Sequence, residues 1–293
     1  MTRDLYQEVT DKIVADLERG VAPWVRPWKC AQPYGGQPYS AISRKPYRGI
    51  NVLLLNAPQY GSTGWMTYKQ AADIGANVRK GERGSMIVFY RPFVVTDRNA
   101  PADGEKHERT IPLLRCFHVF NLEQIENLPE CLKADRPDER TDAQRHAQAD
   151  AILSQASIVH GGDRAYYSIA PDQIRLPQPG AFNTPASYYG TALHELTHWT
   201  GHKSRCDREY GKRFGDQAYA REELVAELGS AFLCGHIGIA GKLQHVEYIA
   251  NWLDVLKGDK RAVLIASSAA QKAADFVLKI EQAETHEDEA VAA

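Results

Sequence analysis

The stretch YYGTALHELTHWTGH, residues Tyr188 to His202, contains the pattern H-E-x-x-H at His194, Glu195 and His198. On an α-helix, residues i and i+4 project from the same face, so both imidazoles can reach one cation. Glu195 is rotated by roughly 100° from His194, which places its carboxylate beside such a cation and not on it. A zinc ion lowers the pKa of a bound water to roughly 7, and a neighbouring carboxylate can then accept the proton. The stretch therefore predicts a metallopeptidase helix with His194 and His198 as ligands and Glu195 as the general base.

The residues around this pattern predict a buried helix that begins near Pro185 and ends at Gly201. Its apolar positions are Tyr188, Tyr189, Ala192, Leu193, Leu196 and Trp199. The alternative is a structural helix that carries a hydrogen-bonded histidine pair. Burying polar groups without partners is costly, and this favours a metal over that alternative.

A catalytic metal needs a third protein ligand and one open coordination position. The segment YAREELVAELGSAFLCGHIG, residues 219–238, reads as a second helix on which Glu223 and Glu227 share a face. We assign Glu223 as the third metal ligand and Glu227 as the carboxylate that orients a ligating histidine. The reverse assignment stays open. Glu222 points about 100° away from Glu223 and is predicted to be solvated.

A third histidine is the other source of a ligand. The metzincin continuation H-x-x-G-x-x-H fits Gly201, but Ser204 stands where its last histidine would be. His202 follows His198 by one turn, yet it lies beyond the expected helix end at Gly201. The glutamates of the second helix are therefore the preferred candidates.

The segment before the active-site helix predicts two short strands, 165–169 and 173–176, joined through Pro171 and Asp172. In metallopeptidases with this helix, a strand at this point can pair with an extended peptide substrate. An ordinary hairpin that leads into the helix is the equal alternative.

Composition places the chain among globular proteins, with 293 residues, 43% hydrophobic and 25% charged. This length predicts two domains. No apolar run is long enough to span a membrane, and the first residues, MTRDLYQEVTDKIV, lack the apolar region of a secretory signal. Five cysteines without a C-x-x-C pattern argue against a disulfide framework. A reduced, cytoplasmic protein is the simplest expectation.

The periodicity of the chain predicts an α+β fold in both domains. An amphipathic helix (4–20), a short apolar helix or strand (50–56), a helix (67–75) and paired strands (85–96 and 112–121) form the first part, and residues 97–110 are the expected hairpin loop. We expect an N-terminal domain at 1–130 with a small antiparallel sheet and flanking helices. Residues 131–150 are the expected linker and start of a helix, and 151–293 the zincin-like domain.

Basic and aromatic residues alternate in the N-terminal part. Between Trp24 and Arg91 there are 10 Lys and Arg against 2 Asp and Glu, a net charge of +8. Cations that follow phosphates, combined with rings on which bases stack, are typical of proteins that bind single-stranded nucleic acid. The candidate DNA-binding residues are Trp24, Arg26, Trp28, Arg44, Lys45, Tyr47, Arg48, Lys69, Arg79, Lys80 and Arg83. Tyr47 is the first choice for stacking, because no apolar periodicity around it predicts burial. The alternative is that the aromatic residues pack the core and the cations are solvated.

Six segments together resemble a known family. They are GVAPWVRPW (20–28), GINVLLLN (49–56), GWMTYKQAADIGANVRKGERG (64–84), VFNLEQIE (119–126) and LHELTHWTGH with YAREELVAELGSAFL (193–202 and 219–233). The chain resembles the plasmid-borne antirestriction proteins of the ArdC type and the related TraC-type proteins of conjugative plasmids.

The resemblance implies an N-terminal domain that binds single-stranded DNA and a C-terminal zincin-like metalloprotease domain of the SprT kind. It also implies a role in conjugation, in which entering plasmid DNA is protected from restriction by the recipient, and passage of the protein with the DNA. SprT-like proteins often use a third histidine, whereas the candidates in this chain are Glu223 and Glu227.

The expected partners are single-stranded DNA and an unidentified protein substrate, for which a component of host restriction is one candidate. Zn²⁺ is the default ion for nitrogen and oxygen ligands, with Mn²⁺ or another divalent ion as the alternative. Two rival functions remain. One is a DNA-coating protein with a structural or idle metal site, and the other is a peptidase whose basic part binds an acidic protein.

Overall fold

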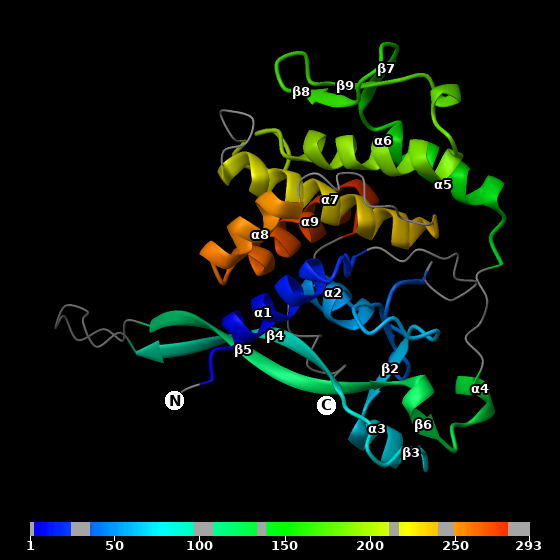
Figure 1. Cartoon of the computed structure of the whole chain (residues 1–293), viewed down its shortest axis with the longest axis vertical. Coiled ribbons are helices and arrows are strands. Elements are labelled where there is room, and N and C mark those ends of the chain that lie inside the picture. The colour runs from blue at the N-terminus through cyan, green and yellow to red at the C-terminus, as the bar shows by residue number, and fades with distance from the viewer. Residues whose placement is uncertain are drawn as a thin grey trace.

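The computed structural model describes residues 3–24, 36–96, 108–133, 139–210, 217–239 and 249–280. In the N-terminal part, helices α1 (Leu5–Glu18), α2 (Ile50–Asn56) and α3 (Tyr68–Asp73) accompany strands β1 (Tyr39–Ser40), β2 (Gly64–Thr67), β4 (Ser85–Thr96) and β5 (Glu108–Asn121). A two-stranded sheet of β3 (Asn77–Val78) and β6 (Ile125–Glu126) lies beside α3 (Figure 1).

The larger sheet has the strand order β1-β2-β5-β4. The predicted antiparallel pairing of β4 with β5 is confirmed. Strand β2 also pairs with β5 in antiparallel, while the two-residue β1 joins β2 in parallel. The 50–56 segment is a helix, and all of its residues are buried. Residues 97–107 of the expected hairpin loop lie outside the described residues.

The C-terminal part contains the predicted active-site helix α6 (Pro185–Thr200), the backing helix α7 (Gln217–Ile237) and a short sheet. This sheet has the order β7-β9-β8, formed by β7 (Ser157–His160), β8 (Tyr166–Ser168) and β9 (Gln173–Leu176). Helices α4 (Glu130–Lys133) and α5 (Asp142–Leu153) connect the two parts, and α8 (Ile249–Gly258) and α9 (Ala262–Leu278) complete the layer of helices (Figure 1).

Local sequence signals explain the ends of α6. The Thr184 hydroxyl accepts a hydrogen bond from the backbone N–H of Ser187 at 3.1 Å, and Pro185 occupies the first turn, where its missing N–H costs nothing. The helix ends before Gly201, close to the side chains of Arg208 and Tyr210. A Cβ on residue 201 would lie 2.9 Å from Nη2 of Arg208. The glycine therefore admits the loop that follows the helix.

A glycine also sets the distance between α6 and α7. A Cβ on Gly229 would lie 2.7 Å from Oγ1 of Thr197, which is closer than Cβ atoms normally approach an oxygen. One residue further, the Ser230 hydroxyl donates a hydrogen bond to the carbonyl of Gly190 at 2.9 Å. This close approach brings the faces of the two helices that carry the candidate ligands within reach of each other.

One apolar core runs through both parts of the chain. Val9 and Ile13 of α1 belong to the same buried cluster as Leu193 of α6 and Trp252 of α8. Helices α1 and α2 lie between the four-stranded sheet and the helices α8 and α9 (Figure 1). The domain boundary at residues 131–150 stays a prediction. The buried apolar cluster includes residues on both sides of this segment.

Candidate metal centre

Helix α6 places His194 and His198 one turn apart on the same face, with their ring centroids 4.9 Å apart. Helix α7 brings Glu223 to both rings. Its Oε2 atom lies 3.5 Å from Nε2 of His194, and its Oε1 atom lies 3.6 Å from Nε2 of His198. One ligand atom from each of the three residues lies within 4.8 Å of the others. The three predicted ligands are therefore brought together.

Glu227 lies on the other side of the His194 ring. Its Oε2 atom is 3.7 Å from Nδ1 of His194, the nitrogen that does not face Glu223. A carboxylate at this position can orient the imidazole and keep Nε2 available to an ion. Of the two assignments that the sequence left open, the geometry favours Glu223 as the ligand and Glu227 as the orienting group.

The chemistry of these groups fits a divalent metal. Two imidazole nitrogens and one carboxylate oxygen are the donor set of several catalytic zinc sites, and the same atoms also accept manganese. Glu195, Glu222, Glu223 and Glu227 are all buried here, and Arg208 is the cation that pairs with one of them. Buried carboxylates are normally paired or bound to metal, so an ion would balance the excess negative charge.

Without an ion, protons balance part of this charge. Burial alone would lower the pKa of His194, but hydrogen bonds with Glu223 and Glu227 raise the pKa to about 9. Burial would also lower the pKa of His198, but hydrogen bonds with Glu222 and Glu223 raise this pKa to about 10. The two imidazoles in turn outweigh burial and hold the pKa of Glu223 well below its ordinary value. A metal ion must therefore compete with protons for this site.

The prediction that Glu222 is solvated is wrong. Its side chain is buried, and its Oε1 atom lies 3.2 Å from Nδ1 of His198. Arg208 donates to both of its oxygens, at 3.0 Å from Nε to Oε2 and at 2.8 Å from Nη2 to Oε1. The reason is that α7 packs against both α6 and the loop after it. Periodicity within α7 shows only which residues share a face, so no local signal could have identified Arg208 or Glu222.

His202 is not part of the cluster. It follows the end of α6, and its Nδ1 atom lies 2.8 Å from the hydroxyl oxygen of Ser204. The loop after α6 instead contacts the sheet. Arg205 in this loop binds Asp172 in the turn between β8 and β9, with distances of 3.0 Å and 2.5 Å between nitrogen and oxygen.

A cleft with a cavity volume of about 390 Å³ opens beside the two histidines. Glu195 lines it, as expected of a general base. Tyr166 and Tyr167 of β8 also line it. Among the strands that the structure describes, β8 pairs only with β9 and is an edge of its sheet. An edge strand at the cleft is the arrangement in which an extended peptide can add a strand.

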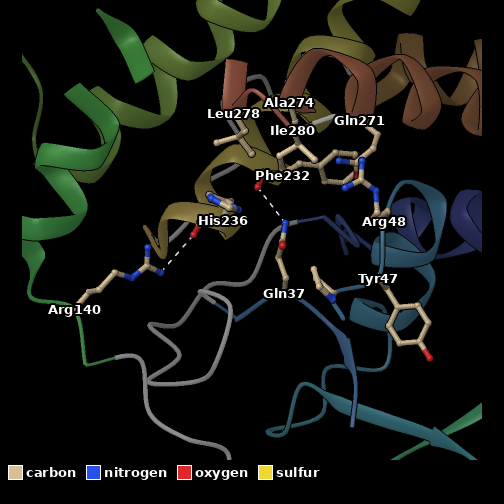
Figure 2. A pocket seen from close by; sticks show the side chains of 11 residues that line it. Gln37, Tyr47, Arg48, Arg140, Phe232, His236, Gln271, Ala274, Leu278 and Ile280 are labelled. Atoms are coloured by element: carbon tan, nitrogen blue, oxygen red, sulfur yellow. Dashed lines mark hydrogen bonds between the residues drawn. The ribbon is translucent and has the colours of Figure 1, made fainter. Parts of the chain in front are cut away.

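The predicted aromatic DNA contacts are largely buried. Trp24 packs edge-to-face on Trp252 with ring centroids 5.8 Å apart. Tyr47 is only 5% exposed and packs with Leu55 and Trp65. Figure 2 shows a second pocket, lined by residues that include Arg48, His236 and Gln271, and the Tyr47 hydroxyl points away from it. The prediction that Tyr47 is available for stacking is wrong, because the sheet and α2 cover its ring. Arg26 and Trp28 lie outside the described residues.

Several of the predicted cations bind groups of the chain itself. Arg48 Nη2 lies 2.5 Å from Oδ2 of Asp275 in α9, Arg79 pairs with Glu82 at 2.7 Å, and Arg44 donates to the carbonyl of Cys131 at 3.2 Å. Lys45, Lys69, Lys80 and Arg83 are exposed.

Exposed rings in the same basic segment lie elsewhere. Tyr68, which begins α3, is 64% exposed and Tyr90 is 43% exposed. They are not among the candidate DNA contacts predicted from the sequence. The packing of the sheet, and not the local pattern, determines which rings are exposed.

The two parts of the chain match two family models. Residues 3–120 match the N-terminal domain of the anti-restriction factor ArdC, and residues 146–269 match a zincin-like metallopeptidase. The crystal structure of the antirestriction ArdC protein from plasmid R388, in its metal-free form, is 39% identical over 94% of this chain and 97% of that chain, with a TM-score of 0.77. The chain belongs to the ArdC antirestriction family. The Mn(II)-bound form of the same R388 protein is 36% identical over 94% of this chain and 98% of that chain, with a TM-score of 0.74.

ArdC-type sequence is also found in longer proteins. The chain is 38% identical over 97% of its length to a DNA primase TraC of Escherichia coli. It spans only 28% and 20% of the length of the two curated TraC relatives. Within the described residues, no helix combines the length and apolarity needed to cross a membrane.

Proposed function

We propose that this ArdC-family protein binds single-stranded DNA that enters a cell by conjugation, protects it from restriction in the cytoplasm, and carries a metal-dependent peptidase site. The observation that carries the peptidase part is the cluster of His194, His198 and Glu223, with Glu195 in the adjoining cleft. Membership of the antirestriction family supports the protective role.

Each residue of the site has a distinct task in this proposal. When bound by His194, His198 and Glu223, the ion supplies Lewis-acid polarisation and acidifies a water molecule. Glu195 accepts the proton of the attacking water at its carboxylate and returns it to the leaving amine. Glu222 and Glu227 each hold one imidazole in orientation through its Nδ1 atom.

Zinc is the proposed ion, because this donor set is that of catalytic zinc sites. The Mn(II)-bound R388 relative supports a divalent ion and makes manganese the first competitor. Elemental analysis of protein purified without added metal, followed by titration with each ion, distinguishes the two.

The DNA-binding part of the proposal rests on the net charge of +8 between Trp24 and Arg91. Tyr47 and Trp24 are buried, and the exposed cations that can contact phosphates include Lys45, Lys69, Lys80 and Arg83. Tyr68 is the exposed ring that replaces Tyr47 as the candidate for stacking.

A conjugation assay across a restriction barrier tests the proposal. Protection by the wild type should be compared with protection by Glu195→Gln, which leaves the ligands in place, and by a double variant of Lys80 and Arg83. If Glu195→Gln protects as well as the wild type, the rival function of a non-catalytic DNA-coating protein replaces the peptidase. If the double variant protects as well as the wild type, Lys80 and Arg83 have no role in protection.

A further inference from the structure

The cleft beside the metal cluster has a wall that the catalytic chemistry does not use. It is formed by Tyr167 and Ile169 from the edge strand and its turn, by Tyr210 from the loop after α6, and by Tyr219 from α7. Rings and an aliphatic side chain therefore stand next to the site where a peptide bond would be broken.

The hydroxyl groups of two of these tyrosines are committed within the protein. Tyr167 donates to Oδ1 of Asp172 at 2.7 Å, and Tyr210 donates to the carbonyl oxygen of His198. Burial and the neighbouring Asp172 raise the pKa of Tyr167 to about 12, so the phenol stays neutral. What the two residues offer to a ligand is ring surface, and ring surface favours apolar groups.

This wall is held in place before any ligand binds. Arg205 binds Asp172 through two nitrogens and also donates to the hydroxyl of Tyr167 at 3.2 Å. The guanidinium of Arg205 lies 3.9 Å from the ring centroid of Trp199 in α6, and its Nε donates to the Trp199 carbonyl at 2.7 Å. The edge strand is thus tied to the active-site helix. A pocket whose walls are fixed in advance loses less free energy on binding and discriminates better.

Charge adds a second criterion. The charged side chains that line the cavity beside the histidines are the carboxylates of Glu195, Glu222 and Glu223. Arg208, which neutralises Glu222, is not among the residues that line the cavity. In the metal-loaded protein the ion balances Glu223 and Arg208 balances Glu222, so Glu195 is the carboxylate that an acidic side chain would meet here. Like charges in a partly buried site repel each other.

We propose that this cleft selects a peptide with a large apolar or aromatic side chain next to the scissile bond and rejects aspartate and glutamate at that position. The inference rests on the proposed peptidase function and names the substrate class of the same site. The Tyr167–Asp172–Arg205 network positions the wall and takes no part in the chemistry.

Binding of amino-acid hydroxamates to the full-length, metal-loaded protein tests this without relying on turnover. The hydroxamate group binds the ion, so the side chain alone differs between the hydroxamates of phenylalanine, leucine, glycine and aspartate. Calorimetry should show phenylalanine and leucine binding at least about 10-fold more tightly than glycine, since even one apolar group in a fitted pocket changes affinity by about that much. Aspartate should bind more weakly than glycine.

Three variants and a control locate the effect. Tyr167→Ala should remove most of the difference between phenylalanine and glycine, whereas Tyr167→Phe should keep it, because the hydroxyl faces Asp172. Ile169 is 47% exposed, so Ile169→Ser should fold and still reduce the preference for leucine. Ile265→Ser, at a position on α9 that is 61% exposed and does not line the cleft, should leave all four affinities unchanged.

Two results would overturn the inference in distinguishable ways. Equal affinities for all four compounds would remove the specificity but leave the metal site intact. If none of the four binds a protein that holds its ion, the proposed peptidase site itself is wrong.

Discussion

Nδ1 of His198 lies 3.2 Å from Oε1 of Glu222, and Arg208 binds both oxygens of that same carboxylate. The orientation of the second candidate ligand therefore depends on a chain of three side chains from α6, α7 and the loop between them. Because Nδ1 is held by Glu222, Nε2 is the nitrogen left to face Glu223 and an ion.

Replacing Glu222 should weaken metal binding without removing a ligand. Glu222→Gln keeps the shape but loses the charge that holds His198 and Arg208, and loss of such an orienting group typically lowers metal affinity by roughly 10–100-fold. Competition with a fluorescent chelator measures this. Arg221→Gln, next in sequence but exposed, is the matched control and should have no effect. Equal affinities of the two variants would show that Glu222 does not orient the site.

Replacing Glu223 and replacing Glu227 should affect metal binding differently. Glu223→Gln should abolish stoichiometric metal binding, as should His194→Ala and His198→Ala, because each removes a ligand. Glu227→Gln should retain the ion with reduced affinity, and Glu195→Gln should retain it fully. Metal content after gel filtration decides the order. If Glu227→Gln loses more metal than Glu223→Gln, the roles of the two residues are exchanged.

The distance between α6 and α7 should affect both the stability of the protein and its affinity for metal. Gly229→Ala introduces a Cβ about where Thr197 lies, so the helices must move apart at a cost of roughly 1–3 kcal/mol in unfolding free energy. Metal affinity should fall as well, because His194 and Glu223 belong to these two helices. Denaturant unfolding and metal titration are the measurements. Gly258→Ala, which has open space around it, controls for the change of residue type.

The metal-free protein should lose stability in alkaline solution. The pKa values of His194 and His198 in the folded state, about 9 and about 10, lie above the ordinary value of 6.5. Their contribution to stability is therefore fully present below pH 6.5 and is lost as the pH rises through 9 and 10. Metal affinity should change in the opposite direction and increase with pH, because binding releases the same protons. Unfolding in the presence of a chelator between pH 6 and pH 10.5 tests the first statement, with His194→Gln/His198→Gln as the variant expected to show a weaker dependence.

Affinity for single-stranded DNA should fall with salt, with a slope of about −0.7 per phosphate contact in a double-logarithmic plot. Replacing Lys80 and Arg83 with glutamine should make that slope shallower. Tyr68→Ala should weaken binding by roughly 1–3 kcal/mol with the slope unchanged, whereas Tyr47→Phe should have no effect, because its ring is buried. Fluorescence anisotropy on the full-length chain measures both quantities, since α1 and α8 share one core and a fragment would expose it. Binding that is insensitive to salt would contradict the phosphate contacts.

Local sequence patterns were sufficient to predict the elements of the site. Helical geometry dictates that residues four apart share a face, so the spacing of His194 and His198, and of Glu223 and Glu227, was sufficient to predict two ligand-bearing helix faces. The amphipathic first helix and the edge-strand hairpin followed from periodicity in the same way.

The groups that each face contacts could not be predicted in this way. Glu222 is buried because Arg208 arrives from a loop, and Tyr47 is buried because a sheet formed by distant strands covers it. Arg48, which local composition assigned to DNA, instead binds Asp275 on α9. Periodicity describes a residue relative to its own helix or strand, whereas burial and ion pairing depend on segments far away in the sequence, whose position the packing of the whole chain sets.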